Sequence, residues 1–121
     1  MKKLILSLSV VVMAIAGGVV DAHPLPKTAN PKPNALLTSS PTEIRIGYSE
    51  GLEIAFTGLE LDGPDGKPVA TGTPSLDPND NKLLIVPIKV TLTPGSYTVN
   101  WHMVGTDTHH VTGHYSFQVK P

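Results

Sequence analysis

The chain has 121 residues, of which 9 are Lys or Arg and 10 are Asp or Glu, so its formal net charge is −1 at pH 7. This length allows one domain with a modest core, which excludes a two-domain nucleotide enzyme and a (β/α) barrel. The near-neutral charge excludes the basic face of a nucleic-acid-binding protein. The chain has no Cys, so disulfides cannot staple the fold and thiolates cannot act as metal ligands or nucleophiles.

The first 22 residues have the features of a secretory signal peptide. Lys2 and Lys3 precede an apolar run from Leu4 to Ala16, and Val20-Asp21-Ala22 supplies small residues before a cut. The alternative is a membrane anchor, but the apolar run falls short of the about 20 residues that a spanning helix needs. We therefore predict a cleaved leader, 1–22, followed by a single domain, 23–121, with a net charge of −2, no membrane span and a location outside the cytoplasm.

Alternating apolar and polar residues predict an all-β domain after a Pro-rich, extended start. In chain order the expected strands are 43–48, 52–61, 83–90, 97–103 and 114–119, with a short apolar piece at 69–70. A change of phase predicts a bulge near Gly58, and Pro87 should lie at an edge or a bulge. Turn residues such as those at 62–66 and 93–95 separate the strands. The pattern predicts a Greek-key β-sandwich or barrel.

The histidines form the most informative pattern. Four of the five lie between residues 101 and 114, and the fifth, His23, follows the predicted cut. Cleavage gives His23 a free α-amine next to its own imidazole, so one residue offers two nitrogens. A second imidazole across this pair completes a T of three nitrogens, which suits the tetragonal preference of Cu(II). Pro24 has no backbone N–H and blocks chelation along successive amides, so the other ligands must come from elsewhere in the fold.

Asp107 and His109 are the predicted source of those ligands. Residues two apart in an extended segment project to the same side, so this carboxylate and imidazole can converge on one ion. Asp-x-His triplets also occur in turns that bind no metal. Glu50 follows a predicted strand and is either a solvated loop residue or a carboxylate near the metal. The remaining candidates have structural interpretations. His102 and His114 fall on solvated strand positions, and His110 points to the side opposite His109. Met103 is expected in the core.

The stretch Trp101 to Lys120, WHMVGTDTHHVTGHYSFQVK, resembles the closing signature of the CopC family of periplasmic copper-resistance proteins, W-x-x-V-S-x-D-x-H-x-x-x-G-x-Y/F-x-F-x-V. Gly105 stands where that pattern has Ser. The similarity extends over nearly the whole mature chain, through His23-Pro24, Ser39-Ser40-Pro41, Tyr48-Ser49-Glu50 and the turn at 92–97.

This resemblance implies a cupredoxin-like or immunoglobulin-like β-barrel of about seven strands that holds one Cu(II) ion in the periplasm. The implied ligands are the α-amine and imidazole of His23, the carboxylate of Asp107 and the imidazole of His109, and Glu50 matches an acid that some members place close to the ion. Members that also bind Cu(I) carry a loop with Met and His, whereas the corresponding segment 57–75 contains neither. The resemblance is therefore to the Cu(II)-only type.

We interpret the chain as a periplasmic copper-binding protein, not an enzyme, that buffers Cu(II) or delivers it to an inner-membrane copper transporter or another periplasmic copper protein. Ligand protonation should weaken binding below about pH 6.5. The alternative is a copper-dependent oxidative enzyme of the polysaccharide-monooxygenase type, which uses the same N-terminal His brace. The small size of the chain, its lack of disulfides and its single Trp disfavour this alternative. A metal-free adhesion or scaffold domain is a third hypothesis.

Overall fold

The computed structural model describes residues 26–121, so the expected signal peptide and His23 lie outside the described residues. These residues form nine strands and one 3-10 turn. The elements are β1 (Thr28–Asn30), β2 (Leu36–Leu37), β3 (Glu43–Gly47), η1 (Ile54–Phe56), β4 (Gly58–Asp62), β5 (Pro68–Val69), β6 (Ser75–Asp77), β7 (Asp80–Pro87), β8 (Gly95–Val104) and β9 (His110–Val119). Within the described range, no helix has the length and hydrophobicity needed to cross a membrane.

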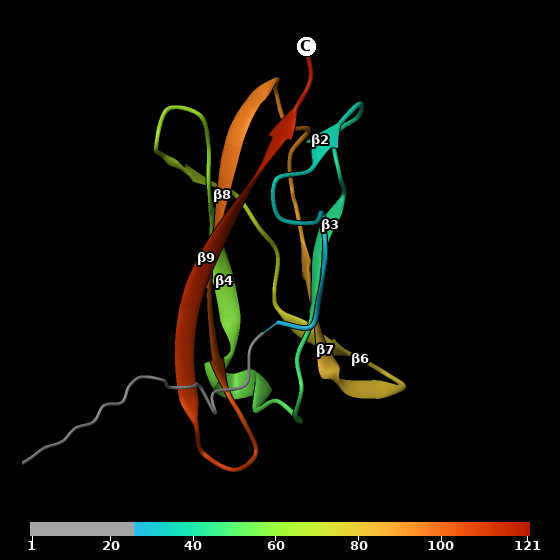
Figure 1. The fold of residues 1–121 in the computed structure, drawn as a ribbon, viewed down its shortest axis with the longest axis vertical. Coiled ribbons are helices and arrows are strands. Elements are labelled where there is room, and N and C mark those ends of the chain that lie inside the picture. Colours follow the sequence, from blue (N-terminus) through green and yellow to red (C-terminus); the bar gives the residue numbers. More distant parts are fainter. Residues whose placement is uncertain (1–25) are drawn as a thin grey trace, which may run out of the picture.

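The strands build two sheets that pack face to face (Figure 1). One sheet has the order β1-β3-β7-β6 and the other β2-β9-β8-β4-β5. Neighbours pair antiparallel except β2 and β9, which run parallel. The predicted all-β sandwich is confirmed. The strand number exceeds the expected seven because short edge pieces of two residues, β2 and β5, add to the longer strands.

Strict alternation along the long strands places apolar side chains between the sheets. The four-stranded sheet contributes Ile44, Ile46, Leu84 and Val86, and the five-stranded sheet contributes Leu61, Val99, Met103 and Phe117, all of them fully buried. Aromatic pairs extend this core at 5.6 Å between ring centroids, edge-to-face for Tyr48 with Trp101 and stacked for Tyr97 with Phe117. Met103 is therefore a core residue, as its strand phase predicts.

Three local predictions are wrong. Instead of a strand through 52–56, Leu52 makes an isolated bridge to Gly105 and η1 follows. Leu52 is buried in the core, but Ile54 and Phe56, which continue the alternation, are 37% and 65% exposed. No bulge occurs at Gly58, where β4 simply begins in regular register with β8. Pro87 lies in an internal strand rather than at an edge or bulge, but it is the last residue of β7, where its missing N–H does no harm.

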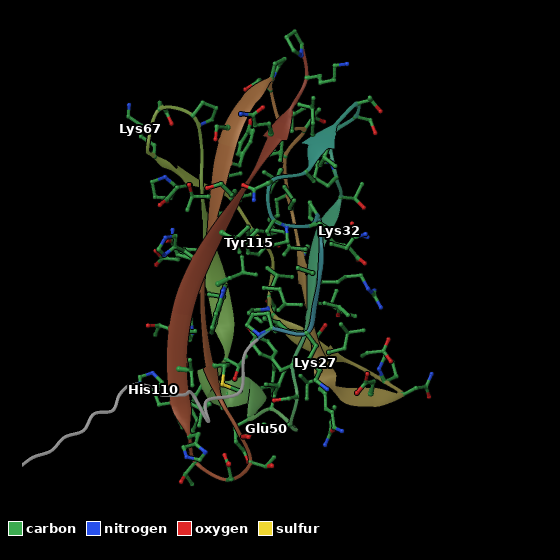
Figure 2. The ribbon with its side chains drawn as sticks, viewed as in Figure 1. Lys27, Lys32, Glu50, Lys67, His110 and Tyr115 are labelled. Carbon is green, nitrogen blue, oxygen red and sulfur yellow. The ribbon has the colours of Figure 1, made fainter. Side chains whose placement is uncertain are left out.

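The loop after β3 and the turn between β8 and β9 meet at one end of the sandwich. The Glu53 N–H donates to the Val104 carbonyl at 2.8 Å, and the Thr106 N–H donates to the Gly51 carbonyl at 3.0 Å. These bonds join segments that are about 50 residues apart in the sequence. Figure 2 shows Glu50 at this end, which His110 at the start of β9 shares.

Candidate metal centre

Three potential ligands come together where these two loops meet. Glu50, Asp107 and His109 each offer one ligand atom, and these atoms all lie within 4.8 Å of one another. Glu50 comes from the loop after β3, and the other two come from the turn between β8 and β9. The structure therefore brings together three of the four predicted ligands. The fourth, His23, lies outside the described residues.

A tight turn positions Asp107 and His109. The Thr108 N–H donates to the Gly105 carbonyl at 2.8 Å, and the Gly105 N–H donates to the His109 carbonyl at 2.9 Å. Thr108 takes a left-handed φ of 73°, as the last loop residue of a three-residue hairpin often does. The His109 N–H donates to Asp107 Oδ1 at 3.0 Å and closes the turn. The expected convergence is present, but its cause is this turn and not the extended segment that the sequence analysis assumed.

The Asp107 carboxylate also contacts the imidazole. Asp107 Oδ2 lies 2.7 Å from His109 Nδ1, and the two side chains are 47% and 58% exposed. An exposed pair of this kind contributes little to folding stability. Its chemical effect is to orient the ring, because an imidazole that donates Nδ1–H to a carboxylate keeps the Nε2 lone pair free for a metal. A metal that binds at Nδ1 instead replaces the contact with Asp107.

Glu50 places a second carboxyl group against Asp107. Glu50 Oε2 is buried and has no hydrogen-bond partner among residues 26–121. A hydrogen bond shared with Asp107, followed by burial and the Asp107 charge, raises the pKa of Glu50. The same hydrogen bond, followed by the His109 N–H, lowers the pKa of Asp107 to about 2. Two carboxyl groups this close together, one of them with a buried oxygen that lacks a partner, match the needs of a bound cation.

Two residues that the sequence analysis did not assign support this arrangement. A Cβ atom at Gly105 would overlap Glu50 Oε2, so the glycine leaves the space that the Glu50 carboxylate fills. Thr57 is the one buried polar residue among those described. Its hydroxyl donates to the Glu53 carbonyl and accepts from the Val104 N–H, which fixes η1 to β8 beside the site. The Gly in place of Ser and a Thr in an apolar run were visible in the sequence, but their partners were not.

The other described histidines stand apart from this group. His110 pairs with Val104 across the hairpin, on the strand phase opposite His109. His102 and His114 share that outer phase, and all three side chains are exposed. The imidazole of His102 lies over Gly58 of β4. These positions agree with the solvated surface roles expected from the alternation.

A β-sandwich that gathers two carboxyl groups and an imidazole at one end has the composition of a metal-binding domain. Residues 26–120 match the CopC domain. The chain is 37% identical to Protein YobA of Escherichia coli (strain K12) over 114 residues, which cover 94% of this chain and 92% of the relative. It is 35% identical to Copper resistance protein C of Escherichia coli over 118 residues, which cover 90% of each chain.

The fold agrees with these relatives. The crystal structure of CopC from Methylosinus trichosporium OB3b superposes with a TM-score of 0.75 at 25% identity, over 82% of this chain and 95% of that one. The chain belongs to the CopC family. It is thus a member of a family of copper-binding proteins of copper resistance.

Proposed function

We propose that the exported, processed protein binds one Cu(II) ion in the periplasm and buffers or delivers it. The ligands are the α-amine and imidazole of His23, the Asp107 carboxylate and the His109 imidazole, with the Glu50 carboxylate in contact with the ion. The observation that carries this proposal is the convergence of Glu50, Asp107 and His109 within 4.8 Å at one end of a CopC-family sandwich. Two carboxylates and neutral nitrogen ligands balance the charge of Cu(II).

The path of β1 supports a role for His23. β1 pairs antiparallel with β3, and the Lys27 N–H donates to the Gly47 carbonyl at 2.7 Å. Followed backward from β1, the chain therefore heads in the same direction as the segment that leads from Gly47 to Glu50. Only three residue steps separate His23 from Pro26, and three residues span at most about 10 Å. This direction supports the proposal that His23 joins the carboxyl groups, which requires them to lie within that span of Pro26.

The donor set favours Cu(II) over Cu(I). Imidazole, amine and carboxylate groups suit Cu(II), whereas Cu(I) prefers thiolates and thioethers. The chain has no Cys, and Met103 is 0% exposed in the core. Soft ligands are therefore missing at this end of residues 26–121.

The exposure of the site suits buffering and delivery. Asp107 and His109 are half exposed, so an incoming ligand from an acceptor protein can reach a metal bound there without opening the fold. An inner-membrane copper transporter or another periplasmic copper protein is the acceptor that we propose.

The test is a Cu(II) titration against a competing chelator, with EPR of the loaded protein. We compare protein that begins at His23 with protein that keeps one extra residue before His23. The processed form should bind one Cu(II) with nitrogen-rich equatorial coordination, and the extended form should lose most of its affinity because its amine has left chelating range. Equal affinity of the two forms would contradict the proposal. Copper- and ascorbate-dependent oxidation of chitin or cellulose would instead favour the oxidative-enzyme hypothesis.

A further inference from the structure

We propose that Gly105 is the positioning residue that admits the Glu50 carboxylate to the copper site and so biases the site toward Cu(II). The inference deepens the proposed function and rests on it. It starts from a steric observation, which does not depend on the metal.

The space beside Gly105 is filled by carboxyl groups. A Cβ atom at this position would overlap Glu50 Oε2 and would lie 2.6 Å from Glu50 Cδ and 2.8 Å from Asp107 Oδ1. Real Cβ atoms essentially never approach other heavy atoms so closely. Any side chain at residue 105 must therefore displace the Glu50 carboxylate and shift Asp107 Oδ1.

The need for space, and not the need for a special backbone conformation, explains why residue 105 is a glycine. The glycines with a left-handed φ in the described chain are Gly66 and Gly95, so Gly105 has a backbone conformation that alanine adopts readily. Its backbone is also held in place, because its N–H donates to the His109 carbonyl and its carbonyl accepts from the Thr108 N–H. It bridges Leu52 as well.

Glu50 is the neighbour that must yield. Its carboxylate is the far end of a flexible side chain, whereas Asp107 is tied to the His109 N–H at 3.0 Å and to the ring at 2.7 Å. A methyl group at residue 105 thus expels the Glu50 carboxylate, and because it still lies 2.8 Å from Asp107 Oδ1 it also requires a smaller shift of that oxygen within the turn.

The expulsion changes the charge of the site. With Glu50 and Asp107 ionised and the imidazoles neutral, Cu(II) gives a neutral site and Cu(I) gives a site of charge −1. Without Glu50, the Cu(II) site carries +1 and the Cu(I) site is neutral. Gly105 therefore acts through Glu50 to favour the divalent ion, because a low-dielectric site disfavours uncompensated charge.

The experiment compares Gly105→Ala, Glu50→Ala and the double variant in processed protein. Gly51→Ala is the control, because its Cβ would face Asn81 Nδ2 at 3.0 Å rather than a carboxylate. Cu(II) and Cu(I) affinities are measured with competing chelators, and the Glu50 carboxyl carbon is followed by NMR in copper-free protein at fixed pH.

We expect Gly105→Ala and Glu50→Ala each to lower Cu(II) affinity by about 10–100-fold, the usual effect of losing a group that supports metal ligands. The double variant should lose no more than either single variant, and Cu(I) affinity should fall less than Cu(II) affinity. Gly51→Ala should leave both affinities unchanged. In copper-free Gly105→Ala the Glu50 carboxyl resonance should move. If Gly105→Ala fails to fold, Glu50→Ala should restore folding.

Losses that add in the double variant, or equal losses for both ions, would overturn the inference. So would a Glu50 resonance that Gly105→Ala does not move, or a folding defect that Glu50→Ala does not relieve. The copper-free measurements separate this inference from the proposed function, which fails if the processed wild-type protein does not bind Cu(II).

Discussion

The hydroxyl of Thr57 should hold η1 against β8, and its removal provides a direct test. β4 begins at Gly58 opposite His102, so Val104 lies beyond the end of β4, where that strand supplies no acceptor. The Thr57 hydroxyl takes this role: it accepts from the Val104 N–H at 3.1 Å and donates to the Glu53 carbonyl at 2.8 Å. Thr57 is 4% exposed, so water cannot easily replace it.

Thr57→Val preserves the side-chain shape and removes the hydroxyl. The Glu53 carbonyl keeps the Phe56 N–H at 3.1 Å, so the main cost is the orphaned Val104 N–H. Leaving such a donor without a partner costs about 1–3 kcal/mol. A loss of about 2 kcal/mol lowers the Tm of a domain of this size by about 8–16 °C.

Thermal unfolding of copper-free protein, followed by circular dichroism, measures this loss. Thr57→Ser is the matched control, because it keeps the hydroxyl and loses a methyl group, which costs about 1 kcal/mol. Thr57→Val should therefore be the less stable of the two variants. A Tm for Thr57→Val equal to that of Thr57→Ser or of the wild type would refute the role assigned to the hydroxyl.

Three further predictions concern the site itself. In Cu(II) titrations His109→Ala should lose the most affinity. Asp107→Ala should lose less, because water partly replaces a carboxylate oxygen, and His110→Ala should lose none. A dominant effect of His110→Ala would shift the ligand assignment by one residue. Thr108→Gly should raise the Tm of copper-free protein, because the left-handed φ of 73° costs a β-branched residue about 1–2 kcal/mol. An unchanged or lower Tm would show that the turn is not strained. The raised pKa of Glu50 gives a contribution to stability that is complete below about 4.5, the ordinary value, and is lost as the pH rises through the raised value. Glu50→Gln should therefore flatten the dependence of Tm on pH over that range, and an unaltered profile would contradict the raised pKa of Glu50.

The long strands could be predicted because their alternation is unbroken. Each of 43–47, 97–103 and 115–119 places every second residue in the core, and a shift by one residue would expose the whole apolar set. The segment 52–56 shows the same alternation and is not a strand. Its apolar residues are too few to decide between period 2 and a single 3-10 turn, and hydrogen bonds to Val104 and Thr57, set by tertiary packing, decide it.

The candidate site could likewise be predicted from the sequence only in part. Asp107 and His109 are neighbours in the sequence, so their convergence could be predicted although the turn that causes it was not. Glu50 lies 57 residues from Asp107, and only the sandwich topology brings the two carboxyl groups together. The role proposed for Gly105 could not be predicted for a related reason. Gly105 has no side chain in a space that the distant Glu50 carboxylate occupies, and a single sequence does not show which distant side chain fills such a space.

The copper-free site holds an arrangement that is unfavourable without a cation. The Glu50 and Asp107 carboxyl groups are in contact, and Glu50 Oε2 is buried without a partner among residues 26–121. A divalent ion relieves both penalties together, so Cu(II) should stabilise the fold by binding the native state. The hairpin backbone needs no rearrangement, because the bonds among Gly105, Thr108 and His109 are already made. If the protein buffers or delivers copper as proposed, loading and transfer should depend on proton release and on ligand exchange at the half-exposed Asp107 and His109.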